Sequence, residues 1–176
     1  MDDILEEGKM IKDESFKTLG HMLERVGEVI KCETIVETEI GWGRFVYNFI
    51  KAFPKAKYYG YDAWEGIRIY DEEMIKKTFS DNPNVILTKI KALDITEFPS
   101  ADLIHINSVC FLKHELELAL KCLKPNGIII VNCIWMEPIK NIIDDWYKNN
   151  QKDYHLHLVN IELWADYKLA MIWRKK

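Results

Sequence analysis

Hydrophobic and polar positions along the chain follow two alternating periods. Short apolar, β-branched runs predict strands, and the segments between them carry apolar residues at three- and four-residue steps, which predicts helices. The predicted strands span residues 34–40, 57–61, 85–90, 103–107 and 128–133, and the predicted helices span residues 44–52, 72–79, 113–123 and 137–149. Regular alternation of strand and helix is typical of an α/β fold.

The N-terminal segment predicts an amphipathic helix that covers the sheet. Its apolar residues recur at three- and four-residue steps, so one stripe of the helix must be buried. These residues are Phe16, Leu19, Leu23, Val26 and Ile30. We therefore expect a single domain with a helical cover over residues 1–31 and a Rossmann-like core over residues 32–176.

The sheet is predicted to be mostly parallel. Residues 128–131 are Ile-Ile-Ile-Val, without a polar position, as expected where helices cover both faces of a parallel sheet. Residues 154–163 and 168–174 are two further strand-like segments at the spacing of a hairpin. The predicted fold is therefore a doubly wound, Rossmann-like α/β sheet with helices on both faces and a C-terminal antiparallel hairpin.

Composition narrows the class of protein. The chain has 176 residues, 48% of them hydrophobic, which is enough for one well-filled core. Its 24 basic and 28 acidic residues give a formal charge of -4, which does not favour nucleic acid as a partner. The sequence has no secretory signal, no apolar run near the roughly 20 residues that span a bilayer, and no C-x-x-C pair. We expect a cytoplasmic protein with no membrane contact, and homodimer formation is left open.

The first predicted strand ends in a glycine-containing loop. Residues 35–43 read Ile-Val-Glu-Thr-Glu-Ile-Gly-Trp-Gly, and a helix is predicted directly after them. One glycine permits a sharp turn and another lets a ligand approach the backbone. The alternative is a tight strand-to-helix turn with no ligand. A dinucleotide fingerprint would need a third glycine where Val46 stands, and no Walker-type lysine follows.

A carboxylate stands at the end of the second predicted strand. Asp62 lies in the run Tyr-Gly-Tyr-Asp-Ala-Trp, where a nucleoside-binding sheet needs an acceptor for two ribose hydroxyls. Trp64 could flank an adenine. The alternatives are that Asp62 caps a helix or lies in a turn and that Trp64 belongs to the core.

With these motifs the sequence resembles the class I S-adenosylmethionine-dependent methyltransferases, from residue 34 to the C-terminus. Residues 39–43 are similar to the first motif of that family and residues 61–62 to the second. Residues 101–107 are similar to its fourth strand, and the run Leu-Lys-Pro-Asn-Gly at 123–127 is similar to its "L-K-P-G-G" turn. The nearest subgroup is the small O-methyltransferases that act on sugars or other small molecules.

The resemblance implies S-adenosylmethionine as cofactor and a set of residues around it. Gly41 and Gly43 would face the methionine part, Asp62 would hold the ribose and Asp94 would reach the adenine. The whole cofactor-binding set is Glu39, Gly41, Trp42, Gly43, Asp62, Ala63, Asp94 and Asn107.

The sequence also departs from the family. Where the subgroup often carries acidic residues after the fourth strand, residues 106–110 read Ile-Asn-Ser-Val-Cys, and Asn132 and Cys133 end the fifth strand. Mg²⁺ and Ca²⁺ prefer several charged oxygen ligands, so we expect no metal site. Phe45 replaces the third glycine of the family motif, which puts the shape of the loop in question.

The expected function is methyl transfer to a small-molecule acceptor, independent of metal. His114 is the candidate general base, because imidazole titrates near neutrality and the residue begins a helix beside the carboxyl ends of the strands; the alternative is an ordinary surface histidine. Two other functions stay open. One is a non-catalytic module that binds a nucleoside or a partner, and the other is an enzyme that uses the aminopropyl or carboxypropyl group of the same cofactor.

Overall fold

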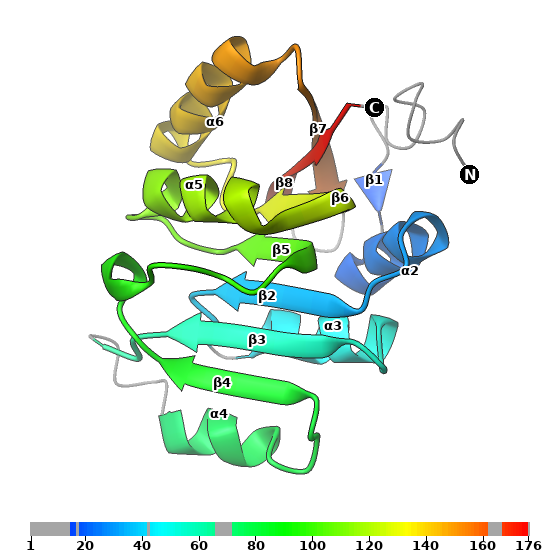
Figure 1. Ribbon diagram of the computed structural model, residues 1–176, viewed down its shortest axis with the longest axis vertical. Coiled ribbons are helices and arrows are strands. Elements are labelled where there is room, and N and C mark those ends of the chain that lie inside the picture. The colour runs from blue at the N-terminus through cyan, green and yellow to red at the C-terminus, as the bar shows by residue number, and fades with distance from the viewer. Residues whose placement is uncertain (1–14, 17, 42, 66–71, 162–166, 176) are drawn as a thin grey trace.

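The computed structural model describes residues 15–16, 18–41, 43–65, 72–161 and 167–175 (Figure 1). Within these residues an eight-stranded sheet has the order β1-β7-β8-β6-β5-β2-β3-β4. The strands are β1 Ser15–Phe16, β2 Thr34–Thr38, β3 Lys57–Asp62, β4 Val85–Lys89, β5 Ala101–Ile106, β6 Leu123–Val131, β7 Tyr154–Ile161 and β8 Tyr167–Arg174. The helices are α2 Leu19–Val29, α3 Arg44–Ala52, α4 Glu72–Thr78, α5 Leu112–Cys122 and α6 Glu137–Asn150, with a 3-10 turn η2 at Ala92–Asp94.

Strand directions confirm the predicted doubly wound fold. Strands β4, β3, β2, β5 and β6 are consecutive parallel neighbours. Strand β8 then runs antiparallel between β6 and β7, which forms the predicted terminal hairpin. The order reverses beside β2, since the chain proceeds to β3 and β4 on one side and returns to β5 and β6 on the other. A reversal of this kind opens a crevice at the carboxyl ends of the strands.

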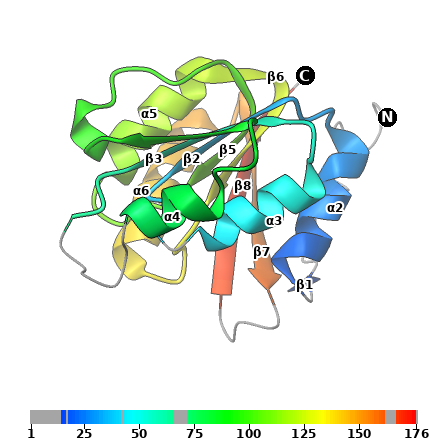
Figure 2. The same cartoon turned by 90° about the horizontal axis from the view of Figure 1, so that it is seen from below.

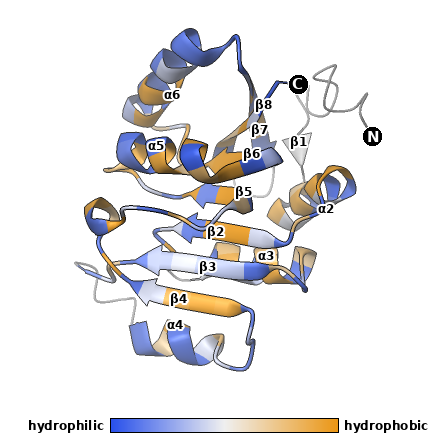
Figure 3. Cartoon of the chain, in the orientation of Figure 1, coloured by the Kyte–Doolittle hydropathy of each residue, from blue (hydrophilic) through white to orange (hydrophobic). Residues whose placement is uncertain are grey.

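Helices cover both faces of the sheet (Figure 2). Helices α2 and α3, with the buried side of α4, belong to one hydrophobic cluster. Helices α5 and α6 belong to a second cluster on the opposite face. Successive strand residues point to alternate faces, so Ile35 packs in the first cluster and Val36 in the second. Figure 3 shows a hydrophobic middle of β2 and a mostly hydrophilic α4 at the edge of the sheet.

Two local expectations were wrong. The predicted N-terminal helix begins only at Leu19, because Thr18 caps it by accepting the His21 amide at 3.1 Å. Phe16 instead lies in β1, which pairs with β7. The predicted turn before the fifth strand is part of β6, which begins at Leu123 and pairs with Ala101 across a register shift. Asn126, with φ of 65°, bends the strand there without ending it.

The described helices are short. None of them is long and apolar enough to cross a membrane.

Candidate functional site

A cavity of about 800 Å³ opens where the carboxyl ends of β2, β3 and β5 meet η2 and α5. This is the crevice expected beside the reversal of strand order, and its volume is in the range of small-molecule sites. Among the described residues, the lining comprises Thr38, Glu39, Gly41, Tyr61, Asp62, Ala63, Trp64, Glu65, Ile90, Lys91, Ala92, Leu93, Asp94, Ile95, Asn107, Cys110, Phe111 and Glu115.

Glu39 is the residue that joins three strand ends. Its amide donates to the carbonyl of Tyr61 at 2.8 Å, and its carbonyl accepts the side-chain amide of Asn107 at 2.7 Å. Its Oε1 accepts the hydroxyl of Ser108 at 3.0 Å. These bonds hold Glu39 at φ of 53°, a left-handed conformation that is uncommon for a residue with a side chain. Such local strain is maintained by its surroundings and is typical of functional sites.

Asp62 organises the loop that follows β2. Its Oδ2 accepts the amide of Gly41 at 2.8 Å, and its Oδ1 accepts the amide of Trp64 at 2.6 Å. Each carboxylate oxygen has a further lone pair, so Asp62 can still accept two hydroxyl groups from a ligand. The two backbone bonds fix the direction in which those lone pairs point.

The two glycines of the loop have different surroundings. At Gly41, with φ of 53°, a Cβ would meet nothing within 4 Å. Gly41 therefore presents open backbone to the cavity, as expected for a ligand loop. Gly43 lies behind the loop, where a Cβ would come within 2.8 Å of the Phe79 ring. The expectation that Gly43 faces a ligand is not supported, since this glycine allows α3 and α4 to pack closely. Trp42 lies outside the described residues.

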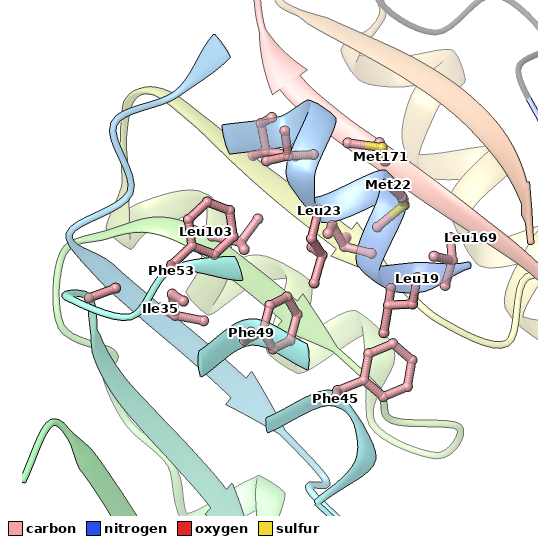
Figure 4. Close-up of a cluster of buried hydrophobic side chains, with 14 of the residues drawn as sticks. Leu19, Met22, Leu23, Ile35, Phe45, Phe49, Phe53, Leu103, Leu169 and Met171 are labelled. Atoms are coloured by element: carbon pink, nitrogen blue, oxygen red, sulfur yellow. The ribbon is translucent and has the colours of Figure 1, made fainter. Parts of the chain in front are cut away.

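Phe45 does not block the cavity. Figure 4 shows the ring among the buried side chains of α2 and α3, on the face of the sheet opposite α5. Its centroid lies 4.1 Å from the ring of His105 and 6.2 Å from that of Phe49. The large residue at the third glycine position is therefore accommodated in the core.

Side-chain amides occupy the strand ends where carboxylates were considered. Asn132, after β6, donates to the side-chain oxygen of Asn107, after β5, and accepts the amide of Cys133 at 2.6 Å. Asn107 in turn donates to Glu39, as described above. The amides thus connect three strand ends without adding charge. The part of the chain that the structure describes contains no group of three or more His, Cys, Asp or Glu residues suited to a metal ion.

The remaining predicted residues divide into two groups. Ala63 and Asp94 line the cavity, Asp94 at the end of η2 after β4. His114 does not line it. Its Nε2 lies 3.0 Å from the carbonyl of Ile95, which can accept a hydrogen bond from that nitrogen. The side chain therefore connects α5 to the segment after η2, and its geometry does not support the predicted role as general base.

Sequence reasoning missed Glu115. This residue lies in the first turn of α5, is fully buried, and lines the cavity. Burial raises the pKa of the Glu115 carboxyl to about 7, a shift opposed by the Ser108 and Thr38 hydroxyls and increased by the charge of Glu39. Burial also raises the pKa of Glu39. The sequence pattern could have indicated Glu115, since this charged residue lies on the apolar stripe of the predicted helix. Leu112, Leu116 and Ala119 share that buried face.

The chain is similar in fold to solved methyltransferases of low sequence identity. A structure from Klebsiella pneumoniae, provisionally named an O-methyltransferase, matches with a TM-score of 0.69 and 14% identity, covering 99% of this chain and 89% of that one. The O-methyltransferase TomG of Streptomyces achromogenes, solved with S-adenosylmethionine, gives 0.67 and 14%, covering 89% and 79%. An rRNA methylase of Streptococcus thermophilus gives 0.65 and 18%, covering 93% and 100%. A search of curated protein sequences found no significant match.

The residues at the site fit the cofactor that these observations imply. The cavity has room for a nucleoside-sized ligand, Gly41 leaves its backbone open to it, and Asp62 retains lone pairs for hydroxyl groups. A family profile described as a methyltransferase domain matches residues 40–173. This match confirms the resemblance drawn from the motifs, including S-adenosylmethionine as the cofactor of an enzyme. The chain belongs to the methyltransferase-domain family.

Proposed function

We propose that the protein transfers a methyl group from S-adenosylmethionine to a small-molecule acceptor without the help of a metal ion. The observation that carries the proposal is the cavity lined by Gly41 and Asp62, where an open glycine backbone and an oriented carboxylate stand at adjacent strand ends. When bound, the cofactor supplies an activated methyl group on a sulfonium. The protein must then bind the cofactor and the acceptor, orient them and exclude water. Positioning alone can lower the activation barrier by several kcal/mol.

Each cofactor contact is assigned to a residue of the chain. Asp62 would accept the two ribose hydroxyls, because its oxygens are already oriented by backbone amides. Gly41 and Glu39 would contact the methionine part across the left-handed loop. Asp94 and Ala63 would lie beside the adenine, and Asn107 would support the loop through its bond to Glu39. His114 is left out of this assignment because it bonds to Ile95.

A small acceptor is supported by charge. The carboxylates of Glu39, Asp62, Glu65, Asp94 and Glu115 line the cavity. Lys91 is the one basic residue among the described residues of the lining, and its Nζ lies 3.1 Å from Glu65. Nucleic acid is bound mainly through phosphates that basic residues neutralise, and this lining does the opposite. We also keep the expectation of a cytoplasmic enzyme, because Cys32, Cys110, Cys122 and Cys133 are free thiols.

The proposal is tested by calorimetry with S-adenosylmethionine and S-adenosylhomocysteine, followed by a transfer assay with a tritiated methyl group. The acceptor panel should hold small alcohols, phenols and amines in one arm and total RNA in the other. Label in the RNA arm would contradict the small-molecule assignment. Binding without transfer would favour the non-catalytic module, and release of 5′-methylthioadenosine would favour aminopropyl or carboxypropyl transfer.

Gly41→Val tests whether the loop after β2 binds the cofactor, without changing the rest of the fold. The substituted side chain would enter the open cavity at a φ that β-branched residues rarely adopt. We expect cofactor binding to be lost while the far-ultraviolet circular dichroism stays near that of the wild type. Unchanged affinity in this variant would remove the loop from the cofactor site. Gly20→Ala, on α2 away from the cavity, is the matched control, because its Cβ would meet only ordinary contacts at 3.7 Å.

A further inference from the structure

Glu115 has no role in the assignment above, yet it is placed as a ligand-binding group. It lies on α5, on the buried face of the helix, and its side chain reaches the cavity beside Thr38 and Glu39. The residue is 0% exposed. A carboxyl group in such a position is rarely retained without a partner.

The hydroxyls of Ser108 and Thr38 stand close enough to lower the pKa of Glu115, but neither forms a hydrogen bond with its carboxyl group. Neither of its carboxylate oxygens has a hydrogen-bond partner among the described residues, and neither does the hydroxyl of Thr38. Ser108 stands nearby, but its single hydroxyl proton is donated to Glu39 and its oxygen accepts the amide of Phe111 at 3.0 Å. The Ser108 hydroxyl is thus used by Glu39, and the carboxyl of Glu115 is left without a hydrogen bond among the described residues.

A fully buried carboxyl at Glu115 and a half-buried one at Glu39 line the same cavity, which favours a shared proton or a bound cation. Burial raises the pKa of both carboxyls; the charge of Glu39 raises the pKa of Glu115 further, and the charge of Asp62 raises that of Glu39. Asp62, Asp94 and Glu65 add negative charge along the same lining, and the thiol of Cys110 also faces the cavity. Lys91 pairs with Glu65 at 3.1 Å. Among the described residues the cavity lining therefore holds five carboxyl groups and one lysine, which is paired with Glu65.

We propose that Glu115 and Glu39 together bind a positive charge of the cofactor, and that cofactor binding releases a proton from this pair. The inference rests on the proposed function, because S-adenosylmethionine is the organic cation that the site is expected to take. That molecule carries two positive groups, the sulfonium and the ammonium of its amino-acid part. Either one would stabilise the ionised pair by the same Coulomb attraction, so the chemistry recognised is an organic cation in a carboxylate-lined recess.

Proton release is measured by calorimetric titration of the wild-type protein at pH 7 in phosphate, MOPS and imidazole buffers, which differ in ionisation heat. With S-adenosylmethionine we expect the apparent enthalpy to vary with buffer heat, with a slope of roughly half a proton per site, since the Glu115 carboxyl is about half protonated near its pKa. S-adenosylhomocysteine keeps the ammonium and lacks the sulfonium, and 5′-methylthioadenosine lacks both. Proton release with both S-adenosylmethionine and S-adenosylhomocysteine would assign the ammonium as the bound group. Proton release with S-adenosylmethionine alone would assign the sulfonium. Proton release with 5′-methylthioadenosine would overturn the proposal.

Variants identify the group that loses the proton. Glu115→Gln keeps the shape of the side chain and removes the titratable carboxyl, so we expect no buffer-dependent heat and about tenfold weaker binding of S-adenosylmethionine at pH 8. Glu117→Gln is the matched control, because Glu117 lies on the exposed side of the same helix. We expect it to bind and release protons as the wild type does.

Three results would overturn the inference. The first is wild-type binding of S-adenosylmethionine with no buffer dependence, which leaves the proposed function standing and needs no variant to fold. The second is undiminished proton release in Glu115→Gln. The third is normal cofactor binding in Glu115→Gln with methyl transfer abolished, which would instead assign Glu115 to the acceptor. Absence of any cofactor binding in the wild type would refute the proposed function as well, so the two failures are distinguishable.

Discussion

Two carboxylates two positions apart in the chain, Glu37 and Glu39, belong to polar clusters of opposite character. Glu37 lies within β2 and points to the face covered by α2 and α3, where it is fully buried. Glu39 follows the strand and lies at the cavity beside Ser108 and Glu115. The first cluster is enclosed by its own partners, and the second is open to a ligand.

The enclosed cluster consists of Glu37, Tyr58 and His105. The hydroxyl of Tyr58 donates to Glu37, and Nδ1 of His105 lies 3.2 Å from Glu37 Oε1, close enough for an ion pair but without hydrogen-bond geometry. The rings of Phe45 and Phe49 pack on the imidazole with centroids at 4.1 and 5.5 Å. Burial raises the pKa of the Glu37 carboxyl, and His105 and Tyr58 oppose this effect. The three polar side chains thus lie together in the core, with one hydrogen bond between Tyr58 and Glu37.

In this fold the surroundings of a buried carboxyl group distinguish a structural role from a ligand-binding role. Both clusters contain a buried carboxyl with a raised pKa, so the pKa alone does not distinguish them. What differs is the surroundings: aromatic rings surround the Glu37 cluster, whereas Glu115 lines a cavity. Changes in the first cluster should therefore affect stability, and changes in the second should affect ligand binding.

The largest expected effect is on the enclosed cluster. Glu37→Ala leaves the Tyr58 hydroxyl and the His105 ring buried without their carboxylate, which should lower the free energy of unfolding by about 3 to 5 kcal/mol. Urea unfolding followed by circular dichroism measures the loss. Glu24→Ala on the exposed side of α2 is the control, and we expect it to change little. Equal stability of the two variants would show that the enclosed cluster is not a structural element.

The next effect is the pH dependence of stability that Glu115 contributes to the open cluster. The pKa of Glu115 is raised from 4.5 to about 7 in the folded protein, so folding favours the protonated carboxyl. The stability that this group contributes is present below about pH 4.5 and is lost as pH rises through about 7, for a total of about 3 kcal/mol. Between pH 5 and pH 8 the wild type should therefore lose stability relative to Glu115→Gln. A constant difference in the free energy of unfolding between the wild type and Glu115→Gln over this pH range would contradict the assignment.

A smaller effect is expected at the ribose position. Asp62→Ala removes a charge-assisted acceptor for hydroxyl groups, which should weaken binding of S-adenosylmethionine by about 1 to 3 kcal/mol, or roughly 5- to 150-fold in Kd. Calorimetry at pH 8 measures the change, and Asp81→Ala in the exposed turn after α4 is the control. If Asp62→Ala binds as tightly as the control, the nucleoside lies elsewhere in the cavity.

The smallest effect comes from removing one hydroxyl from each cluster. Tyr58→Phe and Ser108→Ala each take a donor from a carboxylate, and each should cost about 1 kcal/mol of stability. We expect only Ser108→Ala to change cofactor affinity as well. Thermal unfolding and calorimetry on the two variants give the comparison directly, and a change of affinity in Tyr58→Phe would remove the distinction between the clusters.

Much of the fold followed from local patterns. The helix at residues 44–52 was predicted with the bounds that the structure has, and the terminal hairpin was placed correctly. The errors occurred where pairing with distant parts of the chain determines the secondary structure. Phe16 fits the helical stripe, but pairing with β7 draws it into a strand, and residues 124–127 resemble a turn but remain in β6 because the strand pairs with Ala101.

The sequence alone determined the alternation of elements, the glycine loop, the carboxylate at the end of β3 and the family resemblance, because each depends on residues close together in the chain. Tertiary structure decided which of these residues meet. Asn107 and Ser108 reach Glu39 from 68 and 69 positions away, His114 turns to Ile95, and Glu115 is left facing the cavity. The physical reason is that the state of a buried polar group depends on the partners that surround it, and packing across the sheet supplies those partners.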